Sequence, residues 1–346
     1  MSIRAKIASA VAFAPLLCFL SPLPFFFVTA SVSSTGSTEA VAECVMELNS
    51  RRVLYEKKGD VRLPMASTTK IATAATVLRL GKGMEEEVSI PSQAVGIEGS
   101  SVYLKAGDVY TVEDLLYGLM LRSGNDCATA LALHCSSSVA AFSAEMNETA
   151  QAAGALHTSF QNPHGLPANG HYTTARDLSL ITCYALQNPT FKQIVSTKFY
   201  QPRGWKNKNR MLSEYDGAIG VKTGYTKEAG RCLVSAAERE GMTLVCSVLN
   251  CPTTYERSTQ LLDDAFEAYS YEKILDKEQR FFVETGKEKI ACKTGKDFYY
   301  PLLKEEKGLI EIKTVAKKTK KKEKIVGQVE IYLAKRLLFS GNLYKL

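Results

Sequence analysis

The hydrophobic and polar positions predict strands at the two ends of a large region, with helices between them. Residues 43–57 alternate and contain a turn at Asn49-Ser50, which is typical of a β-hairpin. The apolar run from Ile71 to Leu80 stops at Gly81, as a buried helix does. Thr111 to Asp114 form a capping box ahead of the apolar residues 115–121. Further helices are expected at about 126–134, 138–153, 174–187 and 254–269, and further strands at 218–223, 231–237 and 242–249.

This order of elements is typical of the α+β class. The strands at the two ends are expected to pair in one antiparallel sheet, flanked by the cluster of helices that lies between them in sequence. From about residue 276 the pattern changes to short alternating segments with turns. We therefore predict one domain over residues 43–272 and a smaller β-rich domain over 276–346.

The N-terminus has the features of an export signal. Arg4 and Lys6 precede a stretch without charge, and Val28-Thr29-Ala30 offers the small residues that a signal peptidase recognises. We predict a signal peptide over residues 1–30, cleavage after Ala30, a flexible leader over 31–42 and an extracytoplasmic protein. An uncleaved membrane helix is the alternative, because the stretch is long enough to span, although it is interrupted by Pro15, Pro22 and Pro24.

Charge and composition exclude some functions. The formal net charge is +7, of which Arg4 and Lys6 supply two, so the cleaved chain would carry +5 and gives no case for nucleic-acid binding. The segment Lys313 to Lys324 holds seven lysines and one glutamate. It is either a solvated loop or a contact for anionic wall polymer or lipid headgroups.

No cofactor or metal ion is expected. Eight of the nine cysteines follow Ala30, and Cys127, Cys183, Cys232 and Cys246 lie among apolar residues, as small core side chains do. Neither the cysteines nor the four histidines have the spacing of metal ligands.

Three short motifs carry the chemistry. They are S-x-x-K at residues 67–70, S-x-N at 123–125 and K-T-G at 222–224, a set found together in penicillin-binding proteins and class A β-lactamases. Each motif is weak alone, because the chain holds a second copy of each. The second copies do not follow the same order, and we interpret them as coincidence: Ser270 with Lys273, Ser340 with Asn342, and Lys293-Thr294-Gly295.

The first set predicts a serine nucleophile activated by a lysine. Ser67 and Lys70 are three residues apart at the start of a helix, so their side chains share one face. Lys70 can accept the serine proton only when it is neutral, and burial together with a nearby Lys222 would lower its pKa. The backbone N–H groups of Ser67 and Tyr225 are the expected oxyanion hole.

The remaining motif residues suit the substrate. Ser123 is expected to relay a proton to the leaving amine. Asn125 is expected to bind a substrate amide and to orient the lysine base. Lys222 and Thr223 suit a terminal carboxylate, and Gly224 would let the substrate lie close against a strand.

These segments resemble those of D-alanyl-D-alanine carboxypeptidases, which are serine DD-peptidases and low-molecular-mass penicillin-binding proteins. The resemblance rests on residues 63–71, 123–126, 162–166 and 220–226 and, less specifically, on 327–332. It implies a DD-peptidase/β-lactamase-like fold with a small second domain, acylation by β-lactam antibiotics, and removal of the terminal D-alanine from peptidoglycan stem pentapeptides ending in D-Ala-D-Ala.

Two features depart from the pattern of that family. Many members end in an amphipathic helix on the membrane, whereas the last residues here are strand-like, which leaves anchoring open. Members often place a basic residue ahead of K-T-G to hold the substrate carboxylate, and either Lys208 or Arg210 would serve.

Three other functions share the same machinery. A β-lactamase of class A would need a glutamate for deacylation, and Glu145, Glu148 and Glu214 lie between the second and third motifs. A DD-endopeptidase would use the same residues on cross-links. A penicillin-sensing or wall-binding module would be acylated without turnover.

Overall fold

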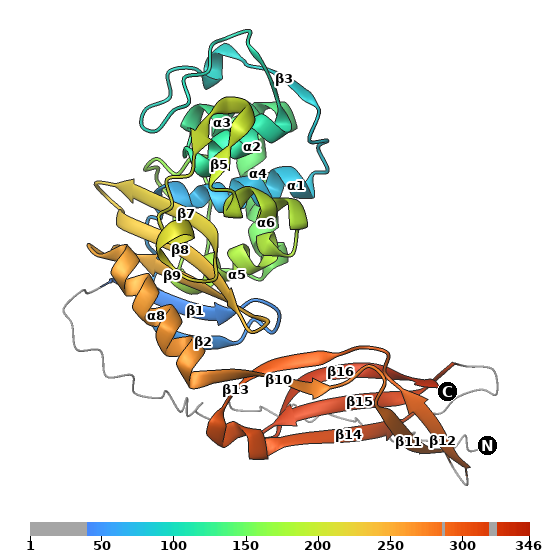
Figure 1. The fold of residues 1–346 in the computed structure, drawn as a ribbon. Helices are drawn as coiled ribbons and strands as arrows, with labels where there is room; N and C mark the ends of the chain where they lie inside the picture. The colour runs from blue at the N-terminus through green and yellow to red at the C-terminus, as the bar shows by residue number, and fades with distance from the viewer. Residues whose placement is uncertain (1–39, 286–287, 318–323) are drawn as a thin grey trace, which may run out of the picture. The chain divides into compact units, whose positions relative to one another are not determined.

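The computed structural model describes residues 40–285, 288–317 and 324–346. The predicted signal peptide and most of the predicted leader lie outside these residues. A five-stranded antiparallel sheet has the order β2-β1-β9-β8-β7 (Figure 1). Its central pairing joins the predicted N-terminal hairpin to the last predicted strand, as expected from the sequence. The bounds are β1 Ala42–Glu47, β2 Val53–Lys57, β7 Ala218–Thr226, β8 Gly230–Arg239 and β9 Met242–Leu249.

Helices cover both faces of this sheet. Helices α5 and α6 pack on one face together with the rest of the helical cluster, and α8 packs against β8 and β9 within a second apolar cluster. The α+β class is therefore confirmed. The helices are α1 Lys70–Arg79, α2 Val112–Leu121, α3 Asn125–Cys135, α4 Val139–Ala153, α5 Ala175–Leu186, α6 Pro189–Ser196, α7 Met211–Glu214 and α8 Thr254–Ala268, with 3-10 turns η1 Ala66–Thr69, η2 Ser92–Ala94, η3 Gln201–Arg203 and η4 Lys304–Leu309.

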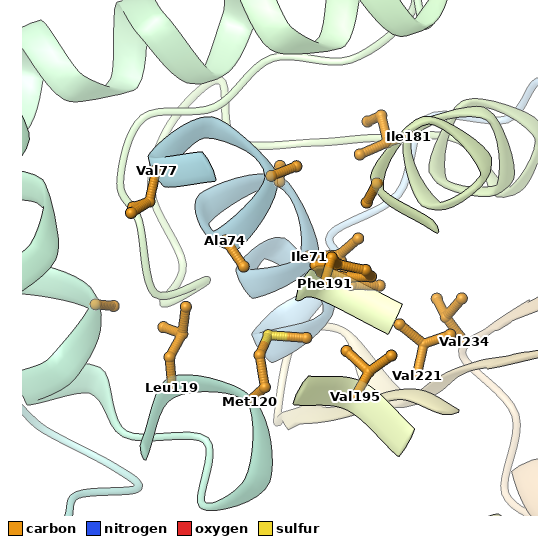
Figure 2. Packing of buried hydrophobic residues seen from close by; sticks show 14 of the residues in the cluster. Ile71, Ala74, Val77, Leu119, Met120, Ile181, Phe191, Val195, Val221 and Val234 are labelled. Atoms are coloured by element: carbon orange, nitrogen blue, oxygen red, sulfur yellow. The ribbon is translucent and has the colours of Figure 1, made fainter. Parts of the chain in front are cut away.

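Helix α1 lies in the centre of the helical cluster and is buried on nearly all sides. Ile71, Ala74 and Val77 are fully buried, and side chains from α2, α5, α6, β7 and β8 surround them (Figure 2). The helix ends where Gly81 adopts a φ of +72°, a conformation that glycine reaches without steric cost. Ile71, the residue that directly follows S-x-x-K, is therefore held in the core.

Side-chain caps set several helix starts. Thr111 accepts a hydrogen bond from the Asp114 N–H at 3.1 Å, as the sequence predicts, and Ser138 and Thr174 cap α4 and α5 in the same way. Helix α6 was not expected from the sequence, although Asn188 caps it and Pro189 occupies its first position. The short α7 and the two-stranded pairs β3 Glu87–Ser89 with β4 Val109–Thr111, and β5 Phe199–Tyr200 with β6 Trp205–Lys206, were also not expected.

Where the structure describes the C-terminal part of the chain, from Tyr269 onward, its regular elements are strands apart from η4. Strand β10 runs from Tyr269 to Leu275 across the predicted domain boundary between 272 and 276 and pairs with β13. The division into domains therefore stays a prediction. A second five-stranded antiparallel sheet has the order β11-β12-β16-β15-β14, and the bounds are β11 Arg280–Thr285, β12 Glu288–Lys293, β13 Phe298–Leu303, β14 Ile310–Ala316, β15 Ile325–Leu333 and β16 Arg336–Lys345.

The lysine-rich segment is not a loop along its whole length. Residues 313–316 belong to β14, and their side chains are exposed, whereas residues 318–323 lie outside the described part of the chain. The expectation of a solvated loop is thus wrong for the first four residues.

Among the described residues no single helix is long and apolar enough to cross a membrane. The pair α3 and α4, bent by 90° at its junction, meets that test of length and composition only when the two are taken together.

Candidate active site

Ser67 lies in the 3-10 turn η1, which leads directly into α1. The sequence predicts an ordinary helix N-terminus here, but the turn is tighter, and its first residue, Ala66, has a φ of +50°. A positive φ at a residue with a side chain is strained and is held by its surroundings. No side chain caps this turn, so the Ser67 hydroxyl is not used as an N-cap.

Lys70 is completely buried and makes three short contacts. Its Nζ lies 3.0 Å from Ser67 Oγ, 2.6 Å from Asn125 Oδ1 and 2.7 Å from the carbonyl oxygen of His164. The sequence predicts the contacts with Ser67 and Asn125. The contact with the His164 carbonyl was missed.

These contacts orient a neutral amine toward the serine. A neutral amine has two N–H donors and one lone pair. The carbonyl oxygens of Asn125 and His164 only accept hydrogen bonds, so they take the two donors. The lone pair is left facing Ser67 Oγ, which is the arrangement that a general base requires.

Burial is the main reason that Lys70 can be neutral. Desolvation holds the pKa of Lys70 well below its usual range, and the positive charge of Lys222 lowers that pKa further. Both causes were predicted from the sequence.

Ser123 and Asn125 form the corner between α2 and α3. Ser123 is buried and has a φ of +64°, a strained conformation typical of functional sites. The Asn125 N–H donates to the carbonyl of Ser100 at 2.7 Å, and its Nδ2 donates to the carbonyl of Glu98 at 2.5 Å. Because Nδ2 is held by a carbonyl, Oδ1 is the atom that faces Lys70.

Asp126 fixes the loop that holds Asn125. Its carboxylate accepts hydrogen bonds from the Ser101 hydroxyl and from the backbone N–H groups of Val102 and Leu104. The sequence includes Asp126 only as part of the family resemblance. Its position shows that it acts by positioning the loop rather than by touching Ser67.

Strand β7 carries K-T-G along the other side of the site. Lys222 is buried, and its Nζ donates to the carbonyl of Thr223 at 2.8 Å. Burial lowers the pKa of Lys222 to about 7, with a further contribution from the charge of Lys208. Thr223 is partly exposed and Tyr225 is 65% exposed, so this edge is open to a substrate.

Gly224 has a structural role that the sequence did not predict. A Cβ built at this position would lie 3.1 Å from the backbone nitrogens of Ser67 and Thr68 and from the carbonyl oxygen of Met65. The missing side chain therefore lets β7 pack against the backbone of η1. The expectation that it also makes room for substrate stays a prediction.

The structure separates the two basic candidates ahead of K-T-G. Lys208 Nζ lies 3.3 Å from Ser100 Oγ, and its charge lowers the pKa values of both Lys70 and Lys222. Arg210 instead faces Glu214 at 3.7 Å and the ring of Tyr255. Of the two candidates, Lys208 is therefore the one whose positive charge acts on Lys70 and Lys222.

The turn at residues 162–166 completes the surroundings of Lys70. Besides the His164 carbonyl, the Pro163 carbonyl accepts from Thr73 Oγ1 at 2.6 Å. Gly165 has a φ of +90°, and a Cβ there would lie 1.9 Å from the Ala66 carbonyl oxygen. The Asn-Pro-His-Gly pattern predicts a turn. It does not predict the contact with Lys70, because that contact is made by a backbone carbonyl, which every residue has.

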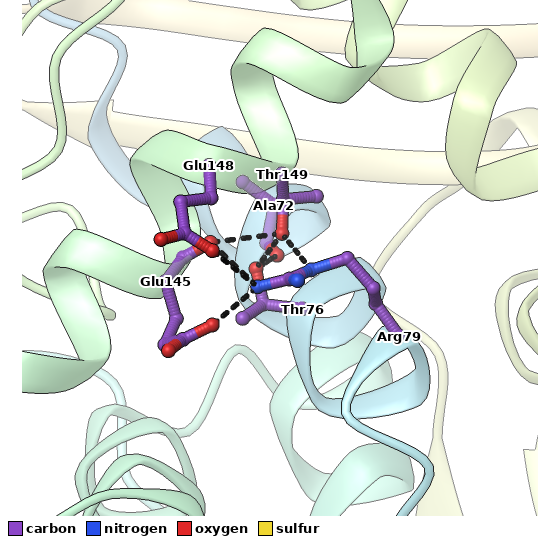
Figure 3. Close-up of polar contacts among 6 residues, drawn as sticks. All are labelled: Ala72, Thr76, Arg79, Glu145, Glu148 and Thr149. Carbon is purple, nitrogen blue, oxygen red and sulfur yellow. Dashed lines mark hydrogen bonds and ion pairs between the residues drawn. The ribbon is translucent and has the colours of Figure 1, made fainter.

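None of the three glutamates considered for deacylation is held at the site. Glu145 and Glu148 pair with Arg79 at the far end of α1, in a group that includes Thr76 and Thr149 (Figure 3). Glu214 pairs with Arg210. These partners argue against the class A β-lactamase mechanism.

The second set of motifs is scattered over the C-terminal sheets. Ser270 lies in β10, Lys293 in β12 and Ser340 in β16. Lys273 pairs with Asp276 and Lys293 with Glu278, both exposed. The structure does not bring them together, as expected.

No group of three or more His, Cys, Asp or Glu side chains in the described part of the chain is placed to hold a metal ion.

Comparison with known proteins agrees with this geometry. A model of the D-alanyl-D-alanine carboxypeptidase family, Peptidase S11, matches residues 28–253. The chain is 31% identical over 332 residues to D-alanyl-D-alanine carboxypeptidase DacF of Bacillus subtilis (strain 168), covering 91% of this chain and 85% of that protein. It is 36% identical over 253 residues to a D-alanyl-D-alanine carboxypeptidase of Streptomyces sp. (strain K15), covering 66% and 87%.

Solved structures agree as well. Penicillin-binding protein 5 from Haemophilus influenzae superimposes with a TM-score of 0.74 at 26% identity, over 90% of this chain and 98% of that one. A variant of the Streptomyces K15 DD-transpeptidase superimposes with a TM-score of 0.63 at 36% identity, over 67% of this chain and 99% of that one.

Proposed function

The chain belongs to the family of D-alanyl-D-alanine carboxypeptidases, and from that premise we propose that it removes the terminal D-alanine of peptidoglycan stem pentapeptides through an acyl-enzyme on Ser67. The observation that carries the proposal is the position of Lys70 Nζ, 3.0 Å from Ser67 Oγ and buried between two carbonyl oxygens. This is the arrangement of an activated serine nucleophile.

In the first half of the reaction, the lone pair of Lys70 takes the proton of Ser67. The serine oxygen then bonds to the carbonyl carbon between the two D-alanines. The C–N bond breaks as Ser123 gives its hydroxyl proton to the departing amine and takes up the proton held by Lys70, which leaves Lys70 neutral again. Lys222 and Thr223 would hold the terminal carboxylate, with Lys208 adding positive charge nearby.

In the second half, a water molecule attacks the ester on Ser67. The same lysine accepts the proton of that water and returns a proton to the serine oxygen as the shortened peptide leaves. The N–H groups of Ser67 and Tyr225 are the proposed donors to the carbonyl oxygen in both halves.

Penicillins would acylate the same serine. Opening of the β-lactam ring leaves the departing nitrogen attached to the acyl group, where it obstructs the hydrolytic water. The ester therefore persists, which is the basis of the proposed sensitivity to β-lactam antibiotics.

The setting of the reaction is also proposed. The substrate lies outside the cytoplasm, so the enzyme would be exported, with cleavage near Ala30, and would take part in cell-wall maturation and the control of cross-linking. A contact of the segment Lys313 to Lys324 with anionic wall polymer or a membrane surface would hold it close to that substrate.

The proposal is tested by D-alanine release from diacetyl-L-Lys-D-Ala-D-Ala. The wild type is expected to release D-alanine, and Ser67→Ala and Lys70→Ala are expected to lose the activity, because one lacks the nucleophile and the other its base. Ser270→Ala and Lys293→Ala, which alter the second set of motifs, serve as matched controls and are expected to retain it. Wild-type rates in Lys70→Ala would show that the base is wrongly assigned.

A further inference from the structure

A cavity of about 470 Å³ lies next to the site and has no part in the mechanism above. Arg62 and Pro64 line it from the segment before Ser67, Asn169 and His171 from the segment after the turn at 162–166, and Glu228 from the turn that follows β7. Its size is within the range of small-molecule sites, about 300–1,000 Å³.

Residues that line this cavity are hydrogen-bonded to the S-x-x-K motif and to the segment before it. His171 Nε2 lies 2.9 Å from Thr69 Oγ1, two residues after Ser67. Leu63, another wall residue, forms a bridge with Thr173, in which the two residues exchange backbone hydrogen bonds of 2.8 and 3.0 Å. The cavity and the nucleophile therefore share one rigid support.

Strand β7 gives the direction in which a bound peptide reaches the cavity. The terminal carboxylate is assigned to Lys222 and Thr223, and the reacting carbonyl to the N–H of Tyr225. The part of the peptide before the reacting carbonyl must then run on past Thr226, toward Glu228. Glu228 follows Tyr225 by three residues, which separate them by at most about 10 Å of chain, a distance that a long side chain on the residue before D-Ala-D-Ala can span.

The cavity presents one positive and one negative side chain. The Arg62 guanidinium lies over the ring of Tyr172, 4.8 Å from its centroid. Neither Arg62 nor Glu228 forms an ion pair with any residue that the structure describes. Two opposite charges that line one cavity without pairing suit a ligand that carries both charges itself.

We propose that this cavity binds the side chain of the residue that precedes D-Ala-D-Ala, and that it selects a diamino acid whose side chain ends in both an amino group and a carboxylate. Glu228 binds the amino group and Arg62 binds the carboxylate. The inference rests on the proposed function, because it takes its orientation from the position of the reacting carbonyl.

Three peptides of the form acyl-X-D-Ala-D-Ala test the inference through kcat/KM for D-alanine release. X is Nε-acetyl-lysine, lysine or meso-diaminopimelate, so the amine and then the carboxylate are added in turn. Each charge is expected to raise kcat/KM about two- to fivefold in the wild type, the usual range for partly exposed ion pairs. Glu228→Gln is expected to abolish the advantage of lysine over acetyl-lysine, and Arg62→Gln the advantage of diaminopimelate over lysine.

Matched variants control for net charge. Lys227→Gln changes an exposed residue that does not line the cavity, and Glu267→Gln changes an exposed residue on α8. Both are expected to keep the wild-type ratios among the three peptides. Penicillin acylation reports for every variant whether the Ser67 site is intact.

Two outcomes would overturn the inference alone: equal kcat/KM for the three peptides in a wild type that releases D-alanine, or wild-type ratios in both Glu228→Gln and Arg62→Gln. Failure of the wild type to release D-alanine from any peptide would instead overturn the proposed function, and the inference with it.

Discussion

At the scale of single residues, the site depends on backbone positions that tolerate no side chain. Gly165 is the clearest, because a Cβ there would lie 1.9 Å from the Ala66 carbonyl oxygen, one residue before Ser67. The contact is with backbone, so it cannot be relieved by rotating a side chain.

We therefore expect Gly165→Ala to slow acylation by penicillin about 100-fold, the cost of misplacing a reacting group by roughly 1 Å. Gly154→Ala is the control. Gly154 also has a positive φ, of +84°, but nothing lies within 4 Å of its added Cβ. It should lose about 1–2 kcal/mol of stability and keep the acylation rate. Stopped-flow acylation and urea unfolding check both, and equal acylation rates in the two variants would contradict the account.

The charge of Lys208 gives a second prediction at this scale. Lys70 must be neutral to act as a base, so acylation slows as the pH falls through its pKa. The positive charge of Lys208 lowers that pKa, so Lys208→Gln should raise it and move the acidic limb of the rate to higher pH. Arg210→Gln should leave the limb in place, because Arg210 faces Glu214. If the acidic limb shifted equally in both variants, the charge of Lys208 would not be what lowers the pKa of Lys70.

The sequence predicts these residues unevenly. Ser67, Lys70 and Asn125 come together as expected because the chemistry acts through their side chains, which the motifs record. The His164 carbonyl could not be predicted, since every residue has one. The strain at Ala66 and Ser123 was likewise hidden, because it is imposed by packing around them rather than by their own preferences.

At the scale of elements, α1 is held from several directions, and α6 is one of its supports. Phe191 from α6 is completely buried beside Ile71 (Figure 2). Phe191→Ala is expected to lower the free energy of unfolding by about 3–5 kcal/mol, through lost burial and the cavity that remains. Phe199→Ala removes a ring that is 45% exposed and should cost about 0.5 kcal/mol or less. Urea denaturation distinguishes them, and similar losses would contradict this packing.

Element length explains which elements the sequence predicts. The long amphipathic helices and the strands of the main sheet have a clear period and recognisable ends. Helix α6 has only eight residues, and β3 to β6 have two or three each, too few for a period to emerge. The Asn188 cap and Pro189 were the available signals for α6. Strand β10 begins at Tyr269, inside the first predicted domain, and ends at Leu275, just before the second, because the change in composition comes later than the change in pairing partner.

At the scale of the whole molecule, the described cysteines are a test of the packing. All eight are free thiols, and only Cys135 is not fully buried. Burial raises the pKa of Cys135 to about 11, which further slows its reaction. We expect the folded protein to take up at most one maleimide at these positions before it unfolds, as read by intact mass. Rapid labelling of several of them without unfolding would contradict the fold.

The two ends of the catalytic region meet in one sheet through the pairing of β1 with β9. This long-range pairing was predictable because strands at the two ends need partners, and the helices between them cannot supply any. It places Ser67 from the first half of the chain beside Lys222 from the second half. Both halves of the catalytic region are thus required to assemble the site.

The central claim is that Ser67 forms an acyl-enzyme during carboxypeptidase turnover. Intact mass after incubation with benzylpenicillin, for the wild type and Ser67→Ala, followed by D-alanine release from diacetyl-L-Lys-D-Ala-D-Ala, tests it most directly. We predict a stable penicilloyl adduct that requires Ser67, together with D-alanine release. Rapid destruction of penicillin would indicate a β-lactamase, and an adduct without D-alanine release would favour a sensor or an endopeptidase. The absence of any adduct would contradict the account outright.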